Sequence, residues 1–381
     1  MSDYIQNYFL NTKQMNNRMI WEECKVKQSP SVSIIMPTFN RENIIYKAID
    51  SVINQNYQNW ELIVVDDRST DNTKKIIKSY IEKDCRIKYI LNTQKKGPAG
   101  ARNCGIYNSN GKYIAFLDSD DEWFEHHLST CVNALENENV DICSALWIEN
   151  CSGNLIKVDK VPELNSEFEK AFKTLNPKIK GDMVFFDEKL FEYSIKKCFY
   201  CYHINTIVLN RTIIDSIGVF KEGLRASEDI DFLYRIFNNY NLCLINDYHF
   251  IYNEGQDNIY RFMDRNNIDV QRIIDDSRLV EKLNLNGINK NNMWKNLKKI
   301  VKVSLKTKDK KECIKIINNR IALKYFTLSF INIKNNRIKS IYYYLYAFIY
   351  KCDIIRFSYL LRLLKPYKVN IDASTYELDF W

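Results

Sequence analysis

The chain has 381 residues, of which 46% are hydrophobic and 27% are charged. These values are typical of a folded globular protein and exclude an intrinsically disordered chain. The 10 glycines and 6 prolines exclude collagen-like and other glycine-rich or proline-rich fibrous repeats. The length is enough for one large domain with an appendage, or for two domains.

The net charge of +8 is distributed unevenly along the chain. Residues 286–368 contain 20 Lys and Arg but 3 Asp and Glu, whereas residues 1–285 have a net charge of −6. Such a shift in charge indicates a boundary between two parts of a chain. We therefore expect an N-terminal extension (1–29), a main domain (30–262) and a basic, helical C-terminal module (263–381).

The cysteines and the N-terminus indicate the compartment. The 11 cysteines have no regular spacing, and Cys198 and Cys201 form an isolated CxxC pair. A structural zinc site normally needs four ligands, so free thiols in a reducing compartment are expected. The polar N-terminus lacks the apolar core of a signal peptide, and no run approaches the roughly 20 apolar residues of a membrane span. We expect a cytoplasmic protein, either free or peripheral on the cytoplasmic face of the membrane.

The first part of the chain alternates between predicted strands and helices. Apolar, β-branched runs predict strands at 32–37, 60–65, 87–91 and 113–117, and helices are expected at 44–54, at 73–84 and from a Gly-containing loop at 97–105. This alternation predicts an open, parallel α/β sheet, whose ligands bind outside the carboxyl ends of the strands. The polar clusters at 38–40, 66–67 and 118–120 follow three of these strands and are expected to line one crevice.

The later elements are less regular. We expect strands at 140–147, 203–209 and 242–251 and helices at 211–217 and 228–238, whereas residues 150–200 show no order that the pattern resolves. From residue 264 onward the chain is expected to be almost wholly helical.

The turn Asp118-Ser119-Asp120, with Asp121 beside it, offers carboxylates directly after a predicted strand. Mg²⁺ and Mn²⁺ prefer such oxygen ligands, and a bound cation offsets the charge of a leaving nucleoside diphosphate. Asp is also common in solvated turns, so the motif alone is a weak indication of a metal site.

Five blocks strengthen this interpretation. They are VSIIMPTFN (32–40), ELIVVDDRSTDNT (61–73), GPAGARNCG (97–105), YIAFLDSDDEW (113–123) and SEDIDFLYRI (227–236). In order and spacing they resemble the family-2 inverting glycosyltransferases over roughly residues 30–260. The resemblance implies a GT-A fold, an open mixed or parallel sheet flanked by helices, and a UDP-sugar or similar donor.

The resemblance also implies roles for individual residues. Metal binding is implied for Asp120 as the direct ligand and for Asp118 as a ligand or a contact to the ribose. The resemblance implies that Pro37, Thr38 and Asn40 border the nucleotide, that Asp67 hydrogen-bonds the base, and that Arg102 lies near the base or the diphosphate. Gly97 and Gly100 would allow close approach of the backbone, and Asp118 and Ser119 are also implied as donor-binding residues. Turn capping is the alternative for Thr38 and Asn40, and a salt bridge on the helix surface is the alternative for Arg102.

Inverting transfer needs a carboxylate that removes the proton of the acceptor hydroxyl. By resemblance, Asp229 is this base and Glu228 orients the base or the acceptor, with Asp231 in a supporting or capping role. The alternative is that Glu228 and Asp229 only complement the dipole of the helix that they begin.

The sequence departs from the family pattern at Asn253, where a His that helps to bind the metal or diphosphate is expected. An amide oxygen coordinates a cation more weakly. His249 is expected to be an ordinary strand residue. For Trp123, stacking on the acceptor and packing in the core both remain open.

Residues 286–368 interleave Lys with aliphatic and aromatic residues, and helices are expected at 295–302 and 310–324. Basic faces with aromatic neighbours suit an anionic membrane surface, where a lipid-linked acceptor would lie. A helical subdomain with a solvated lysine surface and a partner surface are the alternatives. No nucleic-acid motif is present, and no nucleic-acid partner is expected.

The sequence thus predicts a transferase that moves a sugar from a nucleotide-sugar, UDP-hexose or UDP-N-acetylhexosamine, to a glycan or lipid-linked saccharide, with Mn²⁺ or Mg²⁺ as cofactor. A non-catalytic nucleotide-sugar-binding scaffold is the rival from another class. A nucleotidyltransferase would need a Gly-rich phosphate loop, and residues 33–41 contain no Gly.

Overall fold

The computed structural model describes residues 31–151, 153–224, 226–253, 270–351 and 378. The expected N-terminal extension, residues 254–258 after Asn253, and most of residues 352–381 lie outside this range. Within it, no helix has the length and apolar character needed to cross a bilayer.

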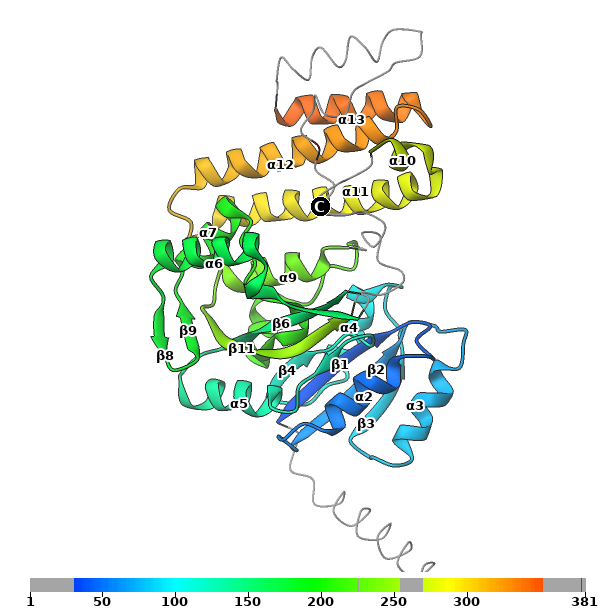
Figure 1. Cartoon of the computed structure of the whole chain (residues 1–381), viewed down its shortest axis with the longest axis vertical. Coiled ribbons are helices and arrows are strands. Elements are labelled where there is room, and N and C mark those ends of the chain that lie inside the picture. The colour runs from blue at the N-terminus through cyan, green and yellow to red at the C-terminus, as the bar shows by residue number, and fades with distance from the viewer. Residues whose placement is uncertain (1–30, 152, 225, 254–269, 352–377, 379–381) are drawn as a thin grey trace, which may run out of the picture.

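One mixed sheet forms the centre of the molecule (Figure 1). Its strand order is β3-β2-β1-β4-β10-β6-β11-β9-β8, and two short strands, β5 and β7, pair with β11 and β6. The strands are β1 (Val32–Thr38), β2 (Trp60–Asp66), β3 (Ile87–Leu91), β4 (Tyr113–Phe116), β5 (Glu122–Trp123), β6 (Ile142–Cys151), β7 (Asn154–Lys157), β8 (Lys178–Lys180), β9 (Met183–Phe186), β10 (Val208–Asn210) and β11 (Leu242–Asn253). The expected mixed sheet flanked by helices is confirmed.

The first four strands form the parallel half of the sheet. β1 lies between β2 and β4, and β2 pairs with β3, all in parallel register. β2 is buried along its whole length, as expected for a strand covered on both faces. Parallel strands end at the same edge of a sheet, so the residues after β1, β2 and β4 meet there, as the sequence predicted.

The second half of the sheet is mixed. β10 is antiparallel to both β4 and β6, whereas β11 runs parallel to β6 and antiparallel to β9. The strand expected at 203–209 is wrong in part. Ile204–Thr206 form a 3-10 turn, in which the Thr206 amide bonds the carbonyl of His203, and the strand begins only at Val208.

Helices cover both faces of the sheet. They are α2 (Ile45–Ile53), α3 (Thr73–Ile81), α4 (Pro98–Tyr107), α5 (His127–Asn137), α6 (Pro162–Leu175), α7 (Lys189–Lys197), α8 (Arg211–Ile217), α9 (Glu228–Phe237), α10 (Val270–Asp275), α11 (Ser277–Val303), α12 (Lys310–Ile331) and α13 (Arg337–Tyr350). Across β6 and β11, α5 lies on one face and α7 and α9 lie on the other (Figure 1).

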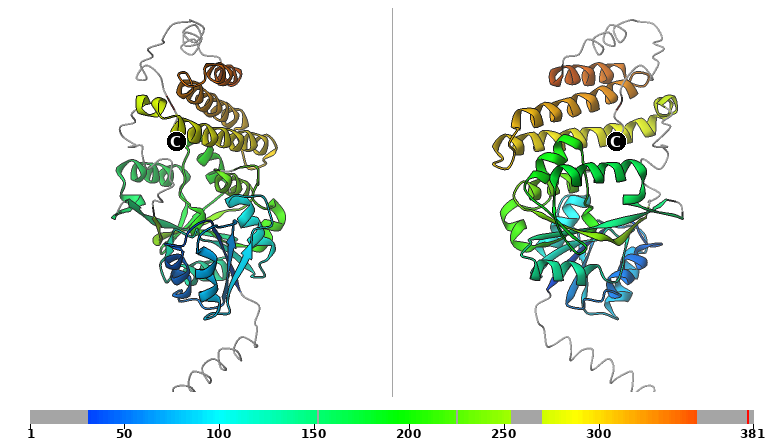
Figure 2. Two further views of the ribbon diagram at one scale, coloured as in Figure 1. Left: turned by 90° about the vertical axis from the view of Figure 1, so that its right-hand side faces the viewer. Right: turned by 60° about the vertical axis from the view of Figure 1, so that its left-hand side comes forward.

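The C-terminal helices are stacked on the domain, as both views in Figure 2 show. α11 packs on α9, α12 packs on α11, and α13 forms the outer layer. The rings of Tyr234 on α9 and Trp294 on α11, with centroids 6.4 Å apart, join the stack to the domain. The helical character expected after residue 264 is therefore confirmed where the structure describes it.

A polar network ties the strands together opposite the crevice. The buried Ser33 hydroxyl donates to Glu61 at 2.6 Å, and the same carboxylate accepts from Lys88 Nζ at 2.6 Å and from the Asn110 amide at 2.8 Å. Burial opposes ionisation of Glu61, but these hydrogen bonds outweigh burial and lower its pKa. The network stabilises this end of the sheet as long as Glu61 is charged.

The expectation of free thiols holds for most of the described cysteines. Cys198 and Cys201 are free, as are six others, whereas Cys85 is disulfide-bonded. The expectation is therefore wrong at Cys85.

Candidate active site

A cleft of about 800 Å³ opens at the carboxyl ends of the parallel strands. This volume is typical of a site for a small molecule or cofactor. The cleft is lined by Pro37, Thr38, Phe39, Arg41, Asp67, Lys96, Gly97, Pro98, Ala101, Arg102, Asp118, Ser119, Asp120, Glu228 and Leu285. The expected crevice therefore exists, and most of the predicted nucleotide-binding and metal-binding residues line it.

Arg102 joins two of the predicted carboxylates. It lies on α4, and its guanidinium donates to Asp118 at 2.7 Å and to Glu228 at 2.8 Å. Its side chain is 4% exposed, so the alternative of a salt bridge on the helix surface is wrong. Burial disfavours its charge, but the charges of Asp118 and Glu228 outweigh burial and raise its pKa. Arg102 therefore stays cationic and joins the acidic turn to Glu228, which lies 126 positions after Arg102 in the sequence.

The carboxylates of the acidic turn pair with different arginines. Asp118 accepts from Arg102, and Asp120 accepts from Arg41 at 3.1 Å, so both face the cleft. Burial raises the pKa of Asp120, and the charge of Asp118 adds to this effect. Crowded carboxylates with hard oxygen donors fit a divalent cation, which relieves their mutual repulsion.

Asp121 supports the turn from behind. It is buried, and its carboxylate accepts hydrogen bonds from the Asn205 amide group and, at 2.7 Å, from the Asn253 backbone amide. Burial raises its pKa well above the usual value, and Asp120 and Asp118 add to the shift. Asp121 therefore anchors the acidic turn to the end of β11.

Asn253 takes part in the same support. Its side-chain amide donates to the backbone carbonyl of Asp120 at 2.9 Å, and its side-chain oxygen accepts from Asn150 at 2.8 Å. Because this oxygen faces Asn150, Asn253 positions the acidic turn in this structure instead of offering a ligand to the cleft.

The loop before α4 is held by Asp67. The Asp67 carboxylate accepts from the Gly97 amide at 2.8 Å and from Asn92 at 2.6 Å. Gly97 has φ of 125°, a conformation that side chains rarely adopt. A Cβ on Gly100 would lie 1.9 Å from the Lys95 carbonyl oxygen. The close backbone approach at Gly100 is thus to the loop itself, and the predicted contact of Asp67 with a base stays a prediction.

Thr38 at the end of β1 and Asn40 in the turn after it have different surroundings. The Thr38 hydroxyl is buried at the cleft wall with no hydrogen-bond partner among the described residues, and a ligand would supply one. The Asn40 side chain instead accepts from the Thr70 amide at 2.8 Å, and its backbone has φ of 51°. The turn-capping alternative therefore describes Asn40 in this structure.

The start of α9 places Glu228 and Asp229 differently. Glu228 lines the cleft and is paired with Arg102, whereas Asp229 is half-buried beside it and its carboxylate accepts from the Ile230 amide at 2.8 Å. Burial and the charge of Asp229 raise the pKa of Glu228, against the effect of Arg102. Asp231 points away, to Arg235 and Lys221 at 3.0 Å each.

Aromatic residues lie next to the acidic cluster. His203 contacts the rings of Tyr252 and Trp147 at centroid distances of 5.6 Å each. Burial lowers the pKa of His203, although the charges of Asp118 and Asp229 oppose this. Trp123 is buried, and its indole donates to the Asn205 carbonyl at 2.6 Å, so its packing role is the correct alternative.

Several residues of the cleft, among them Arg41, Lys96 and Leu285, were not predicted as site residues from the sequence. Arg41 and Lys96 bring positive charge to the cleft, and basic residues just after strand ends are a signal that was available. Leu285 comes from α11 and is 47% exposed at the cleft. No local sequence pattern indicates that Leu285 lies at the cleft, because its position depends on how α11 packs on α9.

Known proteins resemble this chain over its N-terminal part. Residues 33–194 match the family described as glycosyl transferase family 2. GalNAc(5)-diNAcBac-PP-undecaprenol beta-1,3-glucosyltransferase of Campylobacter jejuni is 40% identical over 144 residues, which are 37% of this chain and 46% of that protein. UDP-Glc:alpha-D-GlcNAc-diphosphoundecaprenol beta-1,3-glucosyltransferase WfgD of Escherichia coli is 45% identical over 109 residues, 29% of this chain and 42% of that protein. The chain thus spans less than half the length of these two relatives.

Solved structures show more distant likeness. Mannosyltransferase PcManGT from Pyrobaculum calidifontis, solved in complex with GDP-Man and Mn²⁺, has a TM-score of 0.49 and 15% identity, covering 89% of this chain and 82% of that one. S. aureus TarS 1-349 in complex with UDP-GlcNAc has a TM-score of 0.46 and 16% identity, covering 84% of this chain and 90% of that one.

Proposed function

Because residues 33–194 match glycosyl transferase family 2, we propose that the chain is a metal-dependent inverting glycosyltransferase that uses a nucleotide-sugar donor. The observation that carries this proposal is the cleft itself. Asp118, Asp120 and Glu228 converge there on the carboxyl ends of the strands, with Arg102 between two of them.

Donor binding is assigned to the parallel side of the cleft. The unpartnered Thr38 hydroxyl and the basic residues Arg41 and Lys96 suit a ribose and a diphosphate. Asp120 and Asp118 would hold Mn²⁺ or Mg²⁺ there. A bound cation supplies Lewis-acid stabilisation of the charge on the departing diphosphate. Arg102 keeps Asp118 in place for this task, and Arg41 neutralises Asp120 until a cation binds.

Transfer with inversion needs a base on the opposite side of the sugar. We assign this role to Asp229, which is close enough to raise the pKa of Glu228 and is half-buried at the start of α9. The paired Glu228 then positions the helix end through Arg102. The acceptor hydroxyl loses its proton to Asp229 while its oxygen forms the new bond to the anomeric carbon and the diphosphate departs.

The donor and acceptor classes rest on the relatives. The names of the two curated relatives specify glucosyl transfer to diphosphoundecaprenol-linked saccharides, and one specifies UDP-Glc. We propose UDP-hexose or UDP-N-acetylhexosamine as donor and a lipid-linked saccharide as acceptor. The half-buried rings of His203 and Tyr252, beside Asp118 and Asp229, form an aromatic surface on which an acceptor sugar can stack.

A donor screen tests the proposal. UDP release is measured with UDP-glucose, UDP-GlcNAc and GDP-mannose, with Mn²⁺ or with EDTA, and with a diphosphoundecaprenol-linked GlcNAc acceptor. We expect metal-dependent, acceptor-dependent release from one UDP-sugar, abolished in Asp120→Ala and retained in the control Asp215→Ala on the exposed side of α8. Release by Asp120→Ala at the wild-type rate would contradict the metal assignment. Binding of UDP-sugar without any release would favour the scaffold alternative.

A peripheral membrane location is part of this proposal. Ile338, Tyr342, Leu345 and Ile349 recur at helical spacing and are at least half exposed on α13. The buried Tyr343 and Ala347 occupy its opposite side. An outward apolar stripe within a region of net charge +17 is complementary to an anionic lipid surface.

Flotation tests the membrane assignment. The full chain is mixed with vesicles of phosphatidylcholine with or without phosphatidylglycerol. We expect flotation with the anionic vesicles, and its loss in the Leu345→Glu/Ile349→Glu variant. Leu155→Glu, an equally exposed apolar position on β7, is the matched control and should float. Equal flotation of both variants would contradict the role of α13.

A further inference from the structure

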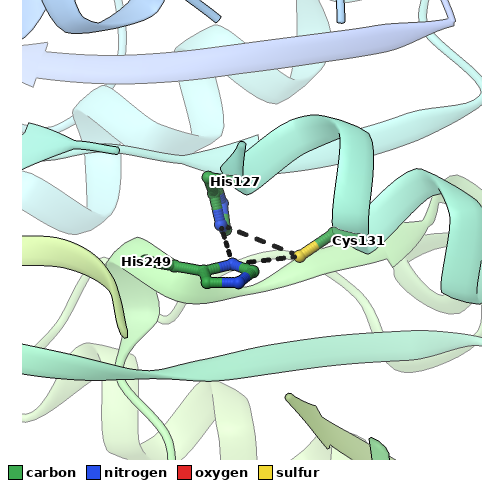
Figure 3. Close-up of side chains that lie close together, drawn as sticks. All are labelled: His127, Cys131 and His249. Carbon is green, nitrogen blue, oxygen red and sulfur yellow. Dashed lines mark hydrogen bonds between the residues drawn. The ribbon is translucent and has the colours of Figure 1, made fainter. Parts of the chain in front are cut away.

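A second cluster of metal-binding side chains lies away from the cleft, between α5 and β11 (Figure 3). His127 is the first residue of α5, Cys131 follows one turn later on the same helix, and His249 comes from the middle of β11. All three side chains are fully buried. The fold thus brings together donors 118 to 122 positions apart in sequence.

The donor atoms converge on one point. The Nδ1 atoms of His127 and His249 are 3.0 Å apart, and the Cys131 sulfur lies 3.7 Å and 4.0 Å from them. Zn²⁺ binds His nitrogen at about 2.0–2.1 Å and Cys sulfur at about 2.3 Å in tetrahedral geometry. Ligands at those lengths are separated from one another by roughly 3.3–3.6 Å. The three observed separations surround these values, so one ion fits between the donors with small side-chain adjustments.

Hydrogen bonding alone does not account for this burial. The Nε2 atoms of His127 and His249 are buried without a hydrogen-bond partner among the described residues. The two rings face each other through Nδ1, where only one proton can be shared. The sulfur contacts are too long for strong hydrogen bonds. Two buried imidazoles and a thiol therefore face one another, and the described residues give them few hydrogen bonds that would offset the cost of burying these polar groups.

The surroundings supply charge and a route to the surface. The Cys143 thiol lies beside the Cys131 thiol, and as a thiolate it would help to neutralise Zn²⁺ together with the first. His126 and Asp247, whose side chains are 3.4 Å apart and partly exposed, lead from solvent to the edge of His249. Imidazole and thiolate are the ligands that Zn²⁺ favours over Mg²⁺ or Mn²⁺.

We propose that His127, Cys131 and His249 bind a zinc ion that fastens α5 to β11. Both partners lead to the acidic turn. Residues 118–121 continue through β5 into α5, and the far end of β11 carries Asn253, which hydrogen-bonds Asp121 and the carbonyl of Asp120. The ion would hold the two supports of the turn at a fixed separation while remaining distinct from the cation in the cleft.

Metal analysis of the purified full chain tests this proposal. The Asp120→Ala background is used throughout, so that a cation in the cleft does not contribute. We expect zinc in stoichiometric amount after dialysis, and its loss in Cys131→Ser and in His249→Gln. Cys313→Ser, a substitution of a fully buried cysteine on α12, is the matched control and should retain zinc.

A second readout covers the case in which a variant folds poorly. Cobalt substitution of the otherwise intact chain should give thiolate-to-cobalt charge-transfer absorption, and a strong chelator should lower its melting temperature. Zinc at background level, with no cobalt–thiolate absorption and no effect of the chelator, would overturn the proposal and leave a buried histidine pair. Retention of stoichiometric zinc by Cys131→Ser would overturn it as well.

Discussion

Arg102 offers the sharpest test of how the site is built. The change Arg102→Met keeps most of the apolar stem but removes the guanidinium that bonds Asp118 at 2.7 Å and Glu228 at 2.8 Å. Breaking a buried ion pair by removing one partner typically costs 3–5 kcal/mol, because the other charge is left buried. The Glu228 side chain is 8% exposed, but that of Asp118 is 28% exposed and recovers some hydration. We therefore expect a loss of about 3 kcal/mol in the free energy of unfolding.

Urea denaturation followed by tryptophan fluorescence measures this loss. The double variant Arg102→Met/Glu228→Gln no longer buries an unpaired charge, so it should recover about 1–2 kcal/mol of the loss. Arg278→Met, at a side chain that is 92% exposed, is the control and should change stability by less than about 0.5 kcal/mol. A loss below about 1 kcal/mol for Arg102→Met, or no recovery in the double variant, would refute the reasoning.

Two further predictions concern the walls of the cleft, and one concerns the Glu61 network opposite it. Gly100→Ala should destabilise the protein by about 1–3 kcal/mol, because its Cβ would meet the Lys95 carbonyl, and should weaken donor binding in a thermal-shift assay. In the control Gly223→Ala the Cβ enters open space, so stability and donor binding should be unchanged. The hydrogen bonds that lower the pKa of Glu61 stabilise the fold at pH values above its unfolded pKa of about 4.3. The difference in unfolding free energy between wild type and Glu61→Gln, measured by urea titration, should therefore shrink as the pH falls through the lowered pKa. A difference that stays constant with pH would contradict this. Leu285→Ala should raise the KM for the donor or the acceptor about five-fold, because about 1 kcal/mol of apolar contact is lost. An unchanged KM for both the donor and the acceptor would show that α11 does not contribute to substrate binding.

The parallel half of the sheet could be predicted because its strands are continuous apolar runs. Each ends in polar residues, so the crevice with Thr38, Asp67 and Asp118 followed from strand direction alone. The strand β8 could not be predicted, since all three of its residues are exposed and it pairs at the sheet edge. Such a strand carries no apolar pattern.

Within the site, many of the residues could be predicted from the sequence, but their hydrogen-bond partners could not. The hydrogen bonds of Asp67 to the Gly97 loop and of Asn253 to the acidic turn depend on tertiary geometry that no local spacing encodes. The same holds for Leu285, which reaches the cleft only because α11 docks on α9. His249 was expected to be an ordinary strand residue, and its contact with His127 appears only in three dimensions.

The central claim is that one carboxylate set binds the donor and another activates the acceptor. Donor affinity and transfer rate are therefore measured together for wild type and Asp229→Asn, with Mn²⁺ present. We predict that Asp229→Asn binds the UDP-sugar with unchanged affinity but transfers it about a hundred-fold more slowly, or worse, as expected for loss of a general base. Transfer by Asp229→Asn at a near-normal rate would contradict the account.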